Sequence, residues 1–178
     1  MRKSIAMPLI ALVLAAVVLL AGYNFLEPYR QARIQEELNA KMQTILPGSE
    51  TFTEEVYTGE DANIRTVYKG QTGYVVGTAT AGYAGPIHML IGVSNDGYVT
   101  GLQVRYMEET FGLGAEALSN WEFLAQFLRT EGDATVGENI DGISGATVTS
   151  KAIARSVNSA VAFVTGSDVD SGATSWGG

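Results

Sequence analysis

Hydrophobic residues divide the chain into one continuous apolar segment and a longer part in which apolar and polar residues alternate. Residues 4–26 form a run of 23 positions without a charge. At about 1.5 Å per residue, a helix of this length crosses a hydrocarbon core of roughly 30 Å. A cleaved signal peptide is the alternative, but the run has no small-x-small cleavage site, and Tyr23 stands where a lipoprotein signal needs cysteine. We therefore expect residues 1–26 to be a membrane anchor.

The segment after the apolar run has helical spacing. Apolar residues recur at intervals of about four positions between Tyr29 and Leu46, and Pro47-Gly48 ends the pattern. This spacing predicts a juxtamembrane helix over residues 27–48. The helix either continues the anchor or forms a hinge with it at Pro28.

The spacing then changes to that of strands. Four segments rich in β-branched and aromatic residues are separated by glycine-containing turns. The segments cover residues 64–70, 72–80, 88–94 and 98–107. Between the last two, Asp96-Gly97 is a pair typical of tight hairpins.

Helical patterns follow the strands. A short helix is expected around Trp121, and a longer one after Thr147 ends at Gly166. The longer helix has an apolar face formed by Ile153, Val157, Ala160, Val161 and Val164. Together the patterns predict an α+β fold, with an antiparallel sheet and flanking helices in a domain over residues 49–166. A tail over residues 167–178 follows it.

Composition excludes several classes of function. The chain has no cysteine, which rules out disulfides, thiolate zinc sites, iron–sulfur ligation and a catalytic thiol. The single histidine, His88, lies in a strand-like run, where a packed residue is more common than a base. We expect no catalytic residue and no metal site.

Charge is distributed unevenly along the chain. All 19 acidic and 9 of the 11 basic residues lie from Glu27 onward, so this part has a net charge of −10. Without a basic stripe it cannot make the phosphate contacts that nucleic-acid binding needs. Arg2 and Lys3 precede the anchor and favour a cytoplasmic N-terminus with an extracytoplasmic body, although Arg30 and Arg33 reduce the asymmetry.

The tetrapeptide Ser-Gly-Ala-Thr occurs twice, at residues 144–147 and 171–174. In both copies an aspartate, Asp141 or Asp168, precedes the threonine by six positions. The first copy comes immediately before the predicted amphipathic helix, and the second is followed only by Ser-Trp-Gly-Gly. This difference in context favours the first copy as a functional site.

The first copy is suited to a phosphate group. The start of a helix presents free N–H groups and the positive end of the helix dipole. Gly145 and Ala146 have little or no side chain, so a phosphate could approach the backbone. Nearby hydroxyl groups belong to Ser144, Thr147, Thr149 and Ser150. The alternative is an ordinary helix N-cap, because serine and threonine are common there.

Three stretches together resemble the FMN-binding domain family. Residues 141–161, DGISGATVTSKAIARSVNSAV, resemble its flavin-attachment segment, and residues 82–104 resemble a strand pair of the family. Residues 108–127, EETFGLGAEALSNWEFLAQF, are similar to its Glu-Thr-Pro-Gly-Leu-Gly loop and the tryptophan-containing helix that follows, with Phe111 in place of proline. The family includes the G subunit of the Rnf-type ion-translocating ferredoxin:NAD⁺ oxidoreductase and the C subunit of the sodium-translocating NADH:quinone reductase.

This resemblance implies a cofactor and a way of holding it. FMN would be joined to Thr147 by a phosphoester, installed by a flavin transferase that takes FMN from FAD and recognises Asp-x-x-Ser-Gly-Ala-Thr. The loop would line the flavin with Glu109, Thr110, Gly112, Leu113 and Gly114. The implied protein is an electron-carrier subunit of an Rnf-type complex, bound to the other membrane and peripheral subunits. It would be a single-pass protein of the cell (inner) membrane, with the FMN domain extracytoplasmic.

Other functions remain open from the sequence. The chain could be the C subunit of a sodium-pumping NADH:quinone reductase, or another anchored FMN-domain protein with a redox or regulatory role. It could also be a non-redox anchored binding module in which Ser-Gly-Ala-Thr only caps a helix. A flavin spectrum of the denatured protein separates the last possibility from the others.

Overall fold

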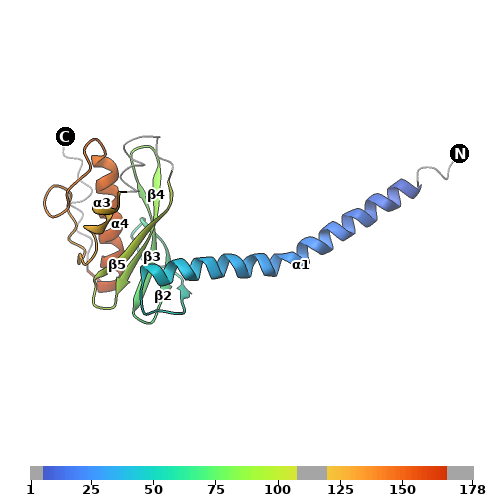
Figure 1. Cartoon of the computed structure of the whole chain (residues 1–178), viewed down its shortest axis with the longest axis horizontal. Coiled ribbons are helices and arrows are strands. Elements are labelled where there is room, and N and C mark those ends of the chain that lie inside the picture. Colours follow the sequence, from blue (N-terminus) through green and yellow to red (C-terminus); the bar gives the residue numbers. More distant parts are fainter. Residues whose placement is uncertain (1–5, 108–119, 168–178) are drawn as a thin grey trace. The chain divides into compact units, whose positions relative to one another are not determined.

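The computed structural model describes residues 6–107 and 120–167, and Figure 1 shows the helices and strands that they form. The chain forms two compact units, of which the first ends at Ala40 and the second begins at Lys41. The second unit contains the sheet and the helices that pack on it.

The first helix, α1 (Ala6–Ile45), continues through Pro28 without interruption. The helical backbone is therefore not broken at Pro28, and a hinge between anchor and juxtamembrane helix stays a prediction. Large apolar side chains from Ile10 to Leu26 are exposed. The helix is long and apolar enough to cross a membrane. The division of this region at Glu27 into anchor and juxtamembrane helix stays a prediction.

The strands form one antiparallel sheet with the order β1-β2-β3-β4-β5. Their bounds are β1 (Thr53–Glu55), β2 (Ile64–Lys69), β3 (Gly73–Ala81), β4 (Pro86–Ser94) and β5 (Val99–Met107). The last four are the strands that the sequence predicted, and the predicted α+β class is confirmed. The Asp96-Gly97 hairpin is also confirmed, since the N–H of Gly97 donates to the carbonyl of Ser94 at 2.9 Å and Gly97 has φ +86°.

One face of the sheet is covered by α4 (Thr147–Thr165), which packs on β3 and β4 (Figure 1). Ile153, Val157 and Val161 of α4 are fully buried with apolar residues of the strands. The short helix α3 (Trp121–Ala125) contributes Phe123, whose ring meets Phe127 edge-on at 5.3 Å. The predicted apolar face of α4 is therefore its buried face, and Gly166 ends the helix in the left-handed conformation.

The last turn of α1 lies on the sheet at Gly92 and Gly101, which are paired across β4 and β5. A Cβ atom at Gly92 would lie 2.5 Å from the carbonyl oxygen of Ile45, and one at Gly101 would lie 2.6 Å from it. The hydroxyl of Thr100 donates to the same oxygen at 2.8 Å. Two opposed glycines thus allow the helix end to contact the sheet backbone, with Met42 and Leu46 buried beside it.

Candidate functional site

The first Ser-Gly-Ala-Thr sequence forms a tight turn that leads directly into α4. The N–H of Ala146 donates to the carbonyl of Ile143 at 2.9 Å, which closes the turn. Gly145 occupies the third position with φ +79°. Type II turns need positive φ at this position, so glycine is the residue that the turn requires.

The turn leaves the start of α4 without a side-chain cap. Ala146 is the N-cap residue, and no side-chain hydrogen bond caps this end of the helix. The carbonyl of Ala146 accepts the N–H of Ser150 at 2.9 Å. The backbone N–H groups of residues 147–149, which precede Ser150 in the first helical turn, have no carbonyl partner within the helix. Their N–H groups point out of the N-terminal end of α4, where the helix dipole favours a negative charge.

Thr147 is the first residue of α4 and its side chain is exposed. Ser144 and Gly145 are exposed as well, whereas Ala146 is buried. An exposed hydroxyl thus stands beside amide donors that have no carbonyl partner within the helix and no side-chain cap from the part of the chain that the structure describes. This arrangement can hold a phosphate group that is bonded to the hydroxyl oxygen.

Thr149 and Ser150, the other two predicted hydroxyl residues, are buried, at 1% and 0% exposure. The Ser150 hydroxyl accepts the N–H of Ile143 at 3.2 Å and donates to the carbonyl of Ala146 at 3.0 Å. It therefore ties both ends of the turn to the helix. Ser150 thus contributes to the site by holding the turn in place.

Side-chain amides fix the loop before the turn. The Gln126 amide accepts the N–H of Asp141 at 2.8 Å and donates to its carbonyl at 3.3 Å. Asn158 of α4 makes the same pair of bonds to the backbone of Ala134, both at 3.0 Å. Asn139 accepts from the N–H of Thr135 at 2.8 Å. The roles of Gln126 and Asn158 were not predicted, because a side chain that bonds to backbone 15 or 24 residues away leaves no local sequence pattern.

The position of Asp141 is held while its side chain remains exposed. Asp141 and Thr147, the first and last residues of the Asp-x-x-Ser-Gly-Ala-Thr pattern, are therefore both accessible to solvent. An enzyme that reads this pattern could contact both.

The pairing of the strands shows which end of the sheet lies near the site. Ser156 of α4 is hydrogen-bonded to Thr80 of β3, and Thr80 is paired with Ile87. Ile87 is paired in turn with Met107, the last residue of β5. The helix extends from Ser156 by about 13 Å to Thr147. The site thus lies toward the end of the sheet at which β5 finishes.

The loop that the resemblance placed against the flavin follows Met107 directly. Its residues, Glu109, Thr110, Gly112, Leu113 and Gly114, lie outside the described residues, and so does Thr174 of the second Ser-Gly-Ala-Thr sequence. Their roles stay predictions. Within residues 6–107 and 120–167, no group of His, Asp and Glu side chains is arranged to hold a metal ion.

Comparisons with known proteins identify the family. Residues 82–162 match the FMN-binding domain family. The G subunit of the ion-translocating oxidoreductase complex of Methanosarcina acetivorans is 34% identical over 166 residues, which are 84% of this chain and 87% of that protein. The chain belongs to this family of G subunits. Its fold, an antiparallel sheet with flanking helices after an apolar helix, contains the FMN-binding domain of that family.

Two further G subunits are similar over different lengths. The one from the proton-translocating ferredoxin:NAD⁺ oxidoreductase complex of Clostridium ljungdahlii is 29% identical over 85% of both chains. The one from the Na⁺-translocating ferredoxin:NAD⁺ oxidoreductase complex of Acetobacterium woodii is 35% identical over 126 residues, which are 63% of this chain and 61% of that protein. The matched FMN-binding domain includes Thr147 and ends before the second Ser-Gly-Ala-Thr sequence.

Proposed function

We propose that this protein is the electron-carrying subunit of a membrane-bound Rnf-type complex that transfers electrons between ferredoxin and NAD⁺ and moves ions. In this proposal FMN is attached to Thr147 by a phosphoester. The names of the relatives support the type of complex, and the match to the FMN-binding domain supports the cofactor. The point of attachment rests on the geometry of the turn before α4.

The observation that carries the proposal is the exposed Thr147 hydroxyl at an uncapped helix start. Serine, threonine, aspartate and asparagine are the usual N-cap residues, but here alanine holds the position and no side chain caps the helix. The first-turn amides therefore remain available to phosphate oxygens. A phosphate bonded to Thr147 would accept hydrogen bonds from them and would lie at the positive end of the helix dipole.

Attachment by this route is a balanced group transfer. The Thr147 hydroxyl oxygen forms a bond to the FMN phosphorus of FAD, and the bridging phosphorus–oxygen bond of FAD breaks. AMP leaves, and the hydroxyl proton passes to a base of the flavin transferase or to water. In the proposal the transferase is a separate protein that recognises Asp141 and the Ser-Gly-Ala-Thr turn.

When bound, FMN supplies the electron transfer, and the protein supplies its position. A covalent link replaces a dissociation equilibrium with a fixed local concentration. The turn at Gly145 sets the direction of the link, and Ser150 holds the turn to α4. Asn158 and Gln126 hold the loop before it. The loop at Glu109–Gly114 would contact the flavin ring.

We further propose a single-pass protein of the cell membrane with a cytoplasmic N-terminus and an extracytoplasmic FMN domain. Support comes from the apolar part of α1 and from Arg2 and Lys3 ahead of it. The partners are the other membrane and peripheral subunits of the complex, since each of these relatives is named as one subunit of a complex.

The test uses the two threonines of the repeated sequence as a matched pair. Thr147→Ala and Thr174→Ala are each produced together with a flavin transferase, and the proteins are run on a denaturing gel, where only covalently bound flavin fluoresces. We expect the band to disappear in Thr147→Ala and to persist in Thr174→Ala. Thr174 is the control because its sequence context lacks a following helical pattern.

A band that survives Thr147→Ala and disappears in Thr174→Ala would contradict the attachment site. Absence of flavin from the denatured wild-type protein would contradict the covalent link. Both measurements need a folded domain, so the thermal unfolding of Thr147→Ala is recorded beside that of the wild type. Thr147 is exposed, and we expect the two unfolding temperatures to agree closely.

A further inference from the structure

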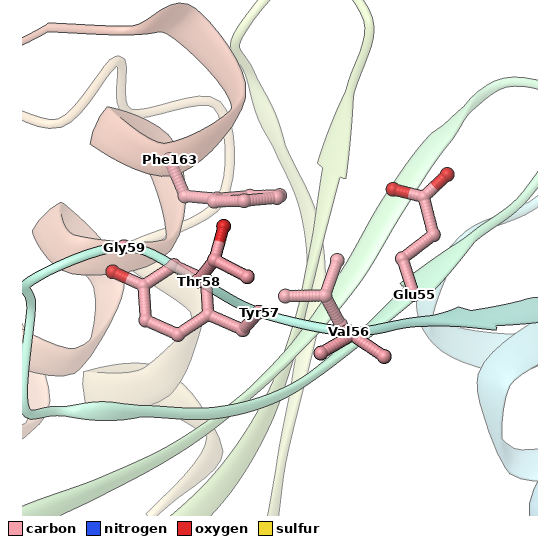
Figure 2. Close-up of a pocket in the computed structure, with 7 residues that line it drawn as sticks. Glu55, Val56, Tyr57, Thr58, Gly59 and Phe163 are labelled. Carbon is pink, nitrogen blue, oxygen red and sulfur yellow. The ribbon is translucent and has the colours of Figure 1, made fainter.

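A pocket of about 350 Å³ lies at the end of α4 opposite to Thr147. Its lining includes Tyr57, Phe163 and Val67, a buried core residue of β2. Figure 2 shows Phe163 reaching from α4 toward the segment that carries Tyr57 and Thr58. Sixteen residues of helix, roughly 24 Å, separate Phe163 from Thr147. The pocket therefore belongs to a different part of the domain from the proposed flavin site.

The aromatic sides of the pocket are held in place. The hydroxyl of Tyr57 accepts the N–H of Asp61 at 3.0 Å. The ring of Tyr57 meets the ring of Phe163 at 5.8 Å and 69°, and Tyr74 meets Phe163 from another direction at 5.6 Å and 86°. Such edge-to-face contacts fix the orientation of the rings. The pocket is thus formed before anything enters it.

The described residues leave this apolar surface uncovered. Val56, at the edge of the pocket, is 89% exposed although its side chain is entirely apolar. It follows β1, the edge strand of the sheet, whose three residues are also exposed. Exposed apolar surface beside a preformed aromatic pocket is typical of a docking site.

The chain itself offers an occupant. It leaves α4 at Gly166, three residues after Phe163, and residues 168–178 remain. Eleven residues span up to about 36 Å when extended, which is ample to return to the pocket. This tail contains one aromatic residue, Trp176, followed by two glycines. We propose that the indole of Trp176 occupies the pocket formed by Val56, Tyr57, Val67 and Phe163.

Docking from the same chain needs little affinity. Closing a loop of about ten residues costs entropy that grows only with the logarithm of its length. A short tether gives Trp176 an effective concentration at the pocket in the millimolar range. A separate partner would need the same concentration in solution to compete with it. Tryptophan combines the largest apolar ring with few rotatable bonds, so it loses little conformational entropy on burial.

Docking of Trp176 would also determine where the second Ser-Gly-Ala-Thr sequence lies. Thr174 stands two residues before Trp176. With the indole in the pocket, Thr174 lies near the end of α4 that carries Phe163, far from Thr147. The inference concerns the chain alone and holds whether or not flavin is attached.

Disulfide formation in the full chain tests the proposal, because the native sequence has no cysteine. Val56→Cys and Gly177→Cys are combined in one chain, and the membrane-embedded protein is treated with a mild oxidant. Tyr83→Cys with Gly177→Cys is the control pair, because Tyr83 is also exposed but lies in the β3–β4 turn, at the opposite end of β3 from Tyr74. Tyr83 lies farther from the end of α4 than Val56 does, so the Trp176→Ser variant of the Val56 pair, whose tether is unchanged, separates docking from tether length.

We expect an intramolecular disulfide to form rapidly in the Val56 pair and slowly in the Tyr83 pair. Adding Trp176→Ser to the Val56 pair should lower the rate about tenfold, the factor expected when burial of a large apolar side chain is lost. Equal rates in the two pairs, or a rate that Trp176→Ser leaves unchanged, would overturn the proposal. Disulfides only between two chains would overturn it as well, since the tail of a second copy would then be the occupant.

Discussion

Substitution of Gly101 by alanine tests how the end of α1 is held against the sheet. The added Cβ atom would lie 2.6 Å from the carbonyl oxygen of Ile45, 2.9 Å from its Cα atom and 3.2 Å from its carbonyl carbon. All three are backbone atoms and cannot rotate away. The last turn of α1 must therefore move off the sheet, which breaks the 2.8 Å bond from Thr100 to Ile45 and loosens the packing of Met42.

The expected loss of stability follows from these two effects. Overpacking of this kind costs about 1–3 kcal/mol, and the hydrogen bond contributes about 0.5–1.5 kcal/mol, so we expect a loss of about 2–4 kcal/mol. For a unit that extends from Lys41 to Gly178, with an unfolding entropy of roughly 2.1 cal/mol/K per residue, this lowers the Tm by roughly 7–14 °C. Thr100→Val removes only the hydrogen bond and should lower the Tm by roughly 2–5 °C.

Thermal unfolding of the full chain in lipid nanodiscs measures the effect. Gly22→Ala is the matched control, because it makes the same chemical change in α1 at a position with no atom within 4 Å of the added Cβ. The covalent flavin proposed at Thr147 should be unaffected in all these variants, since α4 packs on the opposite face of the sheet. If Gly101→Ala unfolds at the same temperature as Gly22→Ala, the helix end is not seated on the glycine pair and the reasoning is refuted.

Three further predictions concern the topology, the loop and the attachment site. A reporter fused after Gly178 should be found on the extracytoplasmic side, because Arg2 and Lys3 precede the anchor; a cytoplasmic signal would reject the proposed orientation. Gly112→Trp should change the flavin spectrum or potential while the fluorescent band on a denaturing gel persists; an unchanged spectrum and turnover would mean that the loop only packs. Gln126→Ala releases the backbone of Asp141, held by bonds of 2.8 and 3.3 Å, and should slow flavin loading with little change in the Tm. Wild-type loading rates would show that the transferase does not need this loop to be fixed.

The sheet was predictable because its strands carry the signals that strand formation depends on. β2 to β5 are rich in β-branched and aromatic residues and are separated by glycine turns, and most of the large aliphatic residues of β2 to β4 are buried. The same holds for α4, whose apolar residues recur at helical spacing. β1 was missed. It has three exposed residues, Thr53–Glu55, so it has neither a buried face nor enough length to show alternation.

The candidate site was predictable only in part. The exposed Thr147 at the start of α4 agrees with the expectation from its sequence context. Burial of Thr149 and Ser150 was not foreseen, because hydroxyl residues in a helix count as polar although they can bond to backbone groups inside the fold. The contact of α1 with Gly92 and Gly101 was not foreseen either, since it joins backbone atoms that are far apart in the sequence.

Ala146 is the residue at which local sequence rules and the structure disagree most clearly. Replacing a serine, threonine or aspartate N-cap by alanine generally costs about 1 kcal/mol, and here Ser144 stands two residues before Ala146 and Thr147 one residue after it. Neither caps the helix: the turn with Gly145 at φ +79° closes at the amide of Ala146, which is therefore the residue at the N-cap position. Without a side-chain cap, the N–H groups of the first turn of α4 stay available to another acceptor. Departures of this kind from local sequence rules are expected at functional sites. A phosphate bonded to Thr147 is an acceptor of the right charge in the right place, so the missing cap is itself an argument for the attachment.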